Sequence, residues 1–148
     1  MTSPLYQASV PVLTQMLTAL SGVLQKAEAH VVAKNIDPNA LLQARLFPDM
    51  FPLVRQVQIA CDFAKGISSR LAGAEVPSWP DSETTFAELQ ALIAKALAHV
   101  GSFQPEQFAQ SEGREIVLRP GTPKEKKLSA SAYLCLLYTS DAADDMQC

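Results

Sequence analysis

The stretch that decides the fold is residues 9–33, which read SVPVLTQMLTALSGVLQKAEAHVVA. Its apolar residues recur every three or four positions, and this spacing places them on one stripe of an α-helix. The stripe comprises Val10, Leu13, Leu17, Leu20, Leu24, Ala27 and Val31. Pro11 fits only near the start of a helix, where its missing N–H has no intrahelical partner. The pattern therefore predicts a long amphipathic helix over residues 9–33.

Two further segments repeat this pattern toward the C-terminus. The first is a helix that Pro52 opens and Gly73 ends. The second begins at Thr85, which forms a capping box with Glu88, and Gly101 stops it. Their seams are Leu53, Val57, Ala60, Ala64, Ile67 and Leu71 in the first helix, and Phe86, Leu89, Ile93, Ala96 and Val100 in the second. Three helices with modest connections favour an up-down bundle of antiparallel neighbours.

After Pro105 the sequence changes character. Residues 114–118 (REIVL) predict a short strand, residues 119–123 (RPGTP) a turn, and residues 126–129 a return strand. Residues 130–134 then have the pattern of the first turn of another helix. The expected fold is mainly all-α, with a small β-hairpin between the third and fourth long helices.

The composition indicates one globular domain. Of 148 residues, 48% are hydrophobic and 18% charged, which is enough apolar material for a core and unlike a disordered chain. The net charge of −3, without a clustered basic surface, argues against nucleic acid as a partner. We expect no membrane span and no secretory signal, so the expected location is cytoplasmic.

Two single residues in or beside the helical segments have simple structural interpretations. Cys61 lies inside the second helical pattern and is expected to be a small buried hydrophobe with a raised pKa and low reactivity. Trp79 lies in the loop that follows the same helix and is expected to cover an edge of the core.

Several ordered blocks of the sequence resemble one bacterial family. The most specific blocks are ARL at residues 44–46, PDMFPL at residues 48–53 and RQVQIA at residues 55–60. Further blocks are residues 5–6, 8–11, 26–30, 36–38, 64–66, 70–73 and 84–89. Together they resemble the domain-of-unknown-function family DUF1993, grouped with the DinB-like four-helix bundles. The resemblance implies a DinB-like four-helix bundle and no established molecular function.

The resemblance also implies a continuation that this chain lacks. Family members carry a long fourth helix, rich in Phe and Tyr and containing histidine, after the position of Leu134. Here residues 135–144 read CLLYTSDAAD, which resembles a translated sequencing-library adapter. We therefore expect an incomplete bundle domain over residues 1–134, with the fourth helix missing, and a non-native, unstructured tail over residues 135–148.

A bundle without its last helix leaves a groove uncovered. The lost burial is on the order of 10 kcal/mol, comparable to the whole stability of a typical domain. We therefore expect this chain to fold poorly, to aggregate, or to depend on a partner that covers the groove. A homodimer is a separate expectation for this chain.

A metal site is not expected in this chain. DinB-like relatives often hold a divalent metal with three histidines, one from the second helix and two from the fourth. This sequence has only His30 and His99, and we expect both to be exposed or capping residues near helix ends. The sequence therefore predicts no metal ligands, no cofactor and no catalytic residues, although a divalent metal remains an expectation for full-length relatives.

The best candidate for a ligand-binding cluster is a group of charged residues. It consists of Arg45, Asp49, Arg55 and Asp62. Arg55 and Asp62 are seven residues apart and share one helix face. The cluster could line a small polar pocket facing the missing helix, or it could fix the corner at residues 48–52 against the following helix. The structural role is the favoured interpretation.

Two classes of function follow from these observations. The first is a non-enzymatic module that binds a small ligand or a partner helix. The alternative is a DinB-like divalent-metal-dependent enzyme whose metal site is incomplete here. Binding is favoured, because the sequence shows no converging set of metal-binding or catalytic groups.

Overall fold

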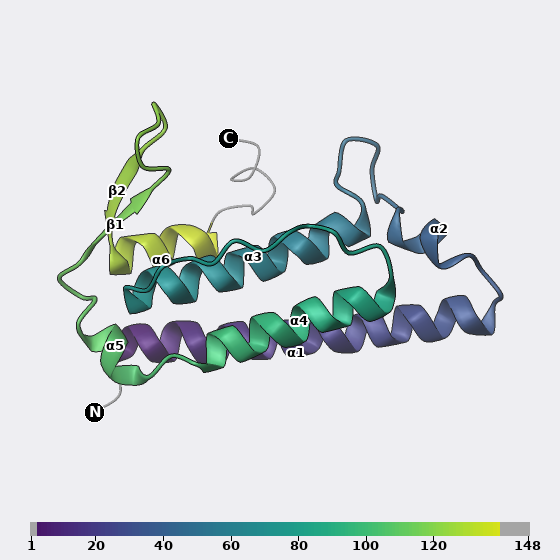
Figure 1. The fold of residues 1–148 in the computed structure, drawn as a ribbon, viewed down its shortest axis with the longest axis horizontal. Helices are drawn as coiled ribbons and strands as arrows, with labels where there is room; N and C mark the ends of the chain where they lie inside the picture. Colours follow the sequence, from purple (N-terminus) through teal and green to yellow (C-terminus); the bar gives the residue numbers. More distant parts are fainter. Residues whose placement is uncertain (1–2, 140–148) are drawn as a thin grey trace.

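The computed structural model of the chain describes residues 3–139, which are mainly helical with one small β-hairpin. This confirms the predicted fold class. The elements are α1 (Pro4–Ala33), α2 (Pro38–Leu42), α3 (Leu53–Ala72), α4 (Phe86–Gly101), α5 (Pro105–Ala109), β1 (Glu115–Leu118), β2 (Lys126–Ser129) and α6 (Ala130–Thr139) (Figure 1).

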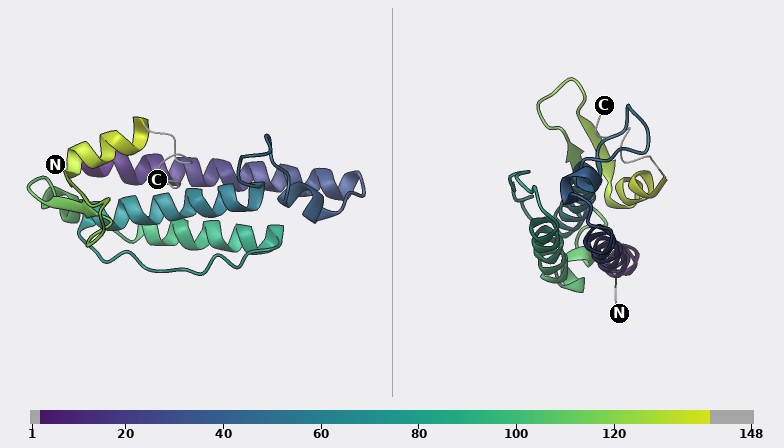
Figure 2. Two further views of the ribbon diagram at one scale, coloured as in Figure 1. Left: turned by 90° about the horizontal axis from the view of Figure 1, so that it is seen from above. Right: turned by 90° about the vertical axis from the view of Figure 1, so that its right-hand side faces the viewer.

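The core lies between α1, α3 and α4, which pack side by side along their lengths (Figure 2). The predicted seams face this core. Buried members are Val10, Leu13, Leu17, Leu24 and Val31 of α1, Val57, Ala64, Ile67 and Leu71 of α3, and Phe86, Leu89, Ile93, Ala96 and Val100 of α4. Trp79 also packs against the core, as expected. Burial of these apolar side chains is the main force that holds the three helices together.

The predicted antiparallel order of neighbouring helices is wrong for α3 and α4. Ser69, near the end of α3, lies 2.7 Å from His99, near the end of α4, so the two helices run in the same direction. Residues 73–85 run back along α3 and α4 before α4 begins (Figure 1). The 16 residues of α4 measure about 24 Å, which about eight extended residues can span. Seam spacing determines which face is buried, but not helix direction.

The first helix begins earlier than predicted. It starts at Pro4 rather than near Ser9, so Pro11 lies inside it. Pro4 occupies the first turn, where its fixed φ favours a helix. Pro11 has no N–H to donate to the carbonyl of Gln7, four residues earlier in the helix. Both residues are exposed. Water can therefore hydrogen-bond the Gln7 carbonyl, and the helix continues through the proline.

The predicted C-terminal end of α3 and the predicted N-terminal cap of α4 are confirmed, with one change of hydrogen-bond partner at the cap. Gly73 ends α3 with a left-handed φ of 74°. Thr85 caps α4, its Oγ1 accepting from the Glu88 backbone N–H at 3.1 Å. The Glu88 carboxylate accepts from the backbone N–H of Thr84 at 2.6 Å, rather than from Thr85 as a capping box predicts. This hydrogen bond is the largest cause of the lowered pKa of Glu88.

The C-terminal part differs from the expected unstructured tail. β1 pairs antiparallel with β2, Ile116 opposite Leu128, as the hairpin prediction requires. α6 then continues past the predicted break at Leu134 to Thr139. Residues 135–139 contain neither proline nor glycine, so nothing local ends the helix that begins at Ala130. α6 lies beside α1, on the side away from α4 (Figure 2). The remainder of the predicted tail, residues 140–148, is outside the described part of the chain.

Candidate functional site

A row of polar residues follows the face of α3 that residues 73–85 cover. The row is Arg55, Gln58, Asp62, Lys65 and Ser69, spaced by three and four positions. Two members hold the covering segment directly. Arg55 forms an ion pair with Asp81, and Gln58 Nε2 donates to Glu83 Oε2 at 2.9 Å. The row therefore fastens the returning segment to α3.

Trp79 is the centre of this contact. The ammonium groups of Lys65 and Lys95 lie 4.8 and 4.6 Å from the centroid of its ring, so both α3 and α4 contribute a cation. Lys65 is only 7% exposed, and Asp62 balances its charge at 3.0 Å. Trp79 thus joins the segment 73–85 to both helices.

His99 is packed against the same tryptophan, which corrects the expectation of an exposed or capping residue. Its ring contacts Trp79 edge-on at 5.8 Å and Phe103 at 5.0 Å between centroids. Burial, and secondarily the charge of Lys65, lower the pKa of His99. The ring is therefore neutral near pH 7, and with the proton on Nδ1 its Nε2 accepts from Ser69 Oγ at 2.7 Å.

A serine hydroxyl beside a neutral histidine is also the geometry of a nucleophile and its base. Ser69, however, is fully buried, and Trp79 packs against the histidine. A substrate carbonyl has no path to the Ser69 hydroxyl in this arrangement. The pair therefore satisfies two polar groups in the packed region between α3 and α4.

Cys61 is buried, as predicted, and burial raises the pKa of its thiol to about 12. Burial is the largest cause of this high pKa, and the neighbouring carboxylates of Asp62 and Glu83 contribute to the same rise. The thiolate is the reactive form of cysteine, so this thiol is inert near neutral pH.

The four residues predicted as a cluster occupy three separate places. Arg45 Nη1 donates to the Met50 carbonyl at 2.7 Å and so closes the corner before α3, where Asp49 is exposed. Arg55 binds the segment 73–85, and Asp62 binds Lys65 on its own helix. Among the described residues, the hydrogen bonds and ion pairs of these four side chains join none of them to another of the four.

The sequence interpretation missed the partners of Arg55 and Gln58. These are Asp81 and Glu83, which lie far from α3 in sequence and come beside it only because residues 73–85 run back along the helix. The available signal was the acidic pair itself, placed close to the single tryptophan of the chain.

The two histidines lie at opposite ends of the bundle. His30 is exposed near the C-terminal end of α1, as predicted. His99 is near the C-terminal end of α4, which runs antiparallel to α1 (Figure 1). Among the described residues, no group of three or more His, Cys, Asp and Glu side chains is placed to hold a metal ion.

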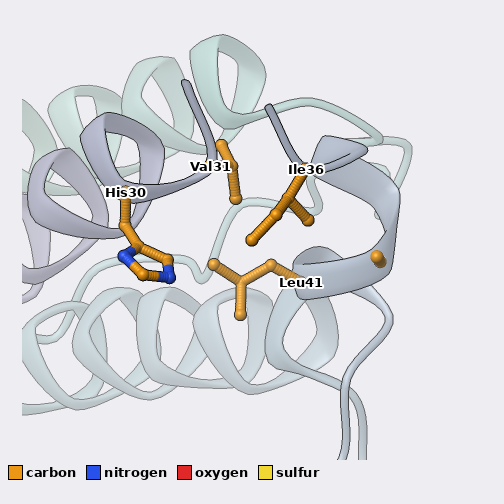
Figure 3. A pocket seen from close by; sticks show the side chains of 5 residues that line it. His30, Val31, Ile36 and Leu41 are labelled. Atoms are coloured by element: carbon orange, nitrogen blue, oxygen red, sulfur yellow. The ribbon is translucent and has the colours of Figure 1, made fainter. Parts of the chain in front are cut away.

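A small apolar recess lies where α1 ends against α2. It is lined by His30, Val31, Ile36, Ala40 and Leu41, and its volume is about 170 Å³ (Figure 3). Pockets for drug-sized ligands measure about 300–1,000 Å³. The recess is therefore too small for a typical small-molecule ligand.

α1 also carries an exposed apolar row on a face beside its buried stripe. Val12, Met16 and Val23 are 37%, 66% and 59% exposed, and Ala19 lies between the last two on the same helix face. Residues 4–25 contain no charged side chain at all. This uncharged α1 row is unusual for a surface helix, whose outer face is normally polar and charged.

Comparison with known proteins agrees with this architecture. A crystal structure of a DinB family member protein from Shewanella denitrificans superposes with a TM-score of 0.82 at 35% sequence identity, covering 97% of this chain and 78% of that one. No curated protein gives a significant match. None of the helices in residues 3–139 has the length and hydropathy of a membrane-spanning segment. A family model described as a domain of unknown function, DUF1993, matches residues 5–140, past the predicted break at Leu134. The chain therefore belongs to the DUF1993 family and has the helical fold of DinB-like proteins.

Proposed function

We propose that this chain is a non-enzymatic binding module whose partner is an amphipathic helix that docks on the uncharged α1 row. The observation that carries the proposal is the exposure of Val12, Met16 and Val23 on a helix stretch without charge. Cores of protein–protein interfaces are depleted in charged residues and enriched in methionine. The row has this composition.

The spacing of the row suits a helix as the partner. Val12, Met16, Ala19 and Val23 alternate steps of four and three, which is the seam of a two-helix contact. The row is about 16 Å long, or three turns of helix. α6 already packs beside α1. A partner helix on the uncharged α1 row would extend the bundle by a further helix–helix contact.

Other functions have less support from the described residues. The recess at α2 is small for a ligand, and several polar side chains of α3 already have partners within the described chain, among them Glu83, Asp81 and His99. A divalent-metal-dependent enzyme would need converging ligands, whereas His30 and His99 lie at opposite ends of the bundle. The cytoplasmic location stays a prediction from the sequence.

The test uses a synthetic helical peptide of about three heptads with leucine at positions a and d. Fluorescence anisotropy of the labelled peptide should show saturable binding to the full chain. Met16→Glu should weaken binding roughly tenfold or more, because it places a charge in the apolar contact. Val117→Glu, which changes an exposed valine of the hairpin, is the matched control and should bind as the unchanged chain does.

Two results would overturn the proposal. One is binding that Met16→Glu and Val117→Glu affect equally. The other is no binding of the peptide together with stoichiometric Zn²⁺ or Mn²⁺ uptake, measured by calorimetric titration, which would favour the metalloenzyme alternative.

A further inference from the structure

The connection between α2 and α3 presents large apolar side chains to solvent. Leu46 is 93% exposed, Phe47 63% and Met50 38%, in a loop that projects from the bundle (Figure 1). Exposed apolar residues that gather in one place mark interaction sites more often than residues scattered singly. Leu46 and Phe47 are also next to each other in sequence, with Pro48 following.

Hydrogen bonds hold this loop in a defined shape. Leu53 N–H donates to the Ala44 carbonyl at 3.0 Å, which closes the loop at its base. Met50 N–H donates to the Phe47 carbonyl at 3.0 Å, and Arg45 donates to the Met50 carbonyl. Phe47 is therefore presented on an ordered turn, which lowers the entropic cost of placing its ring in a pocket.

The recess beside α2 has the size and lining to take one such ring. Its volume is about 170 Å³ and its walls are mainly the apolar side chains of Val31, Ile36 and Leu41 (Figure 3). An apolar cavity of about 150 Å³ is known to bind benzene. The recess lies directly before the loop along the chain, at the same end of the molecule (Figure 1).

We propose that the chain forms a two-fold symmetric dimer in which Phe47 of each copy occupies the recess beside α2 of the other. A projecting ring and a ring-sized recess at the same end of one chain can pair reciprocally between two copies, as an isologous contact requires. Charges agree with this pairing. Asp49 follows Phe47 closely, Lys34 is next to the recess, and neither forms an ion pair within residues 3–139. Across the dimer the two would face each other.

This contact is separate from the uncharged α1 row, so the dimer does not rest on the proposed binding of a helix. It is also small. Interfaces that bury less than about 1,200 Å² in total are characteristically weak and transient. The dimer is therefore expected to dissociate on dilution.

The first test is sedimentation velocity of the full chain over a wide concentration range. The unchanged chain should shift from monomer to dimer with rising concentration. Phe47→Ala should weaken dimerisation roughly a hundredfold, because two ring contacts are lost per dimer. Val117→Ala removes exposed apolar surface from the hairpin and should leave dimerisation unchanged. Far-ultraviolet circular dichroism of all variants checks that the helices are retained.

Two further variants address the recess and the charges. Ala40→Phe fills the recess from its own chain and should abolish dimerisation although Phe47 remains. Asp49→Lys should weaken the dimer, and Lys34→Asp in the same chain should restore it.

The proposal is overturned if the unchanged chain is monomeric at every concentration, or if Phe47→Ala dimerises normally. Met16→Glu serves to separate the two surfaces. It should lose binding of the helical peptide and keep the dimer, so each proposal fails independently of the other.

Discussion

Gly73 shows how one residue meets two requirements at the end of α3. Its φ of 74° is costly for any residue with a Cβ, and an added Cβ would overlap the guanidinium of Arg114. Gly22, in the middle of α1, meets neither requirement, because a Cβ there has nothing within 4 Å. The two glycines therefore have opposite roles in stability.

This contrast makes a matched prediction. Gly73→Ala should destabilise the chain by about 1–2 kcal/mol or more, through the left-handed backbone and displacement of Arg114. Gly22→Ala should stabilise it by about 0.5–1 kcal/mol, since alanine is the better helix former. Urea unfolding followed by circular dichroism measures both. Equal effects of the two substitutions would show that the α3 end is not formed as described.

His99 makes a prediction about pH at the same scale. Its pKa in the folded chain is lowered from 6.5, first by burial and then by Lys65. As the pH falls below 6.5, the unfolded chain therefore takes up this proton before the folded chain does. The contribution of His99 to the free energy of unfolding is fully present above pH 6.5. It is lost as the pH falls from 6.5 through the lowered pKa of the folded chain.

The measurement compares urea unfolding at pH 7.5 and pH 5.5 for the unchanged chain and His99→Gln. Glutamine keeps a hydrogen-bond acceptor for Ser69 but does not titrate. The unchanged chain should lose more stability on acidification than the variant. His30 and the carboxylates are common to both proteins, so the difference isolates His99. An identical loss in both would contradict the packing described for this ring.

At the scale of elements, the returning segment 73–85 depends on several modest contacts rather than one strong one. The Arg55–Asp81 pair is partly solvated, with side chains 30% and 40% exposed. A double-mutant cycle with Arg55→Ala and Asp81→Ala should therefore give a coupling of only about 0.2–1 kcal/mol. Coupling well above this range would mean that the pair is more buried in solution than here.

The elements also show what local sequence can and cannot predict. The stripe in residues 9–33 and the ends at Gly73 and Thr85 were predictable, because periodicity and capping are local properties. The parallel direction of α3 and α4 was not, because it depends on where residues 73–85 run after leaving α3. The partners of Arg55 and Gln58 were missed for the same reason.

The candidate site was less predictable than the fold. Charges near a proline-rich corner suggest a network of Arg45, Asp49, Arg55 and Asp62. Arg45 alone hydrogen-bonds within that corner, to the carbonyl of Met50. Helical spacing correctly placed Arg55 and Asp62 on one face, but spacing does not reveal which distant segment covers that face.

At the scale of the whole molecule, the buried and exposed faces of α1 have different consequences. The buried stripe joins α3 and α4 into one core, whereas the uncharged row of Val12, Met16 and Val23 stays open. The loop with Phe47 and the recess beside α2 form a second apolar surface at the end of the bundle. A protein with two such surfaces is suited to assembling with other helices and with itself.

The central claim is that the uncharged α1 row is a docking surface for a helix, and a methyl NMR titration tests it most directly. Addition of the helical peptide should shift the methyl resonances of Val12, Met16 and Val23 in proportion to saturation. The methyl groups of Val117 and Ile36, away from the row, should not move. Shifts confined to those control positions, or no shifts at saturating peptide, would contradict the proposal.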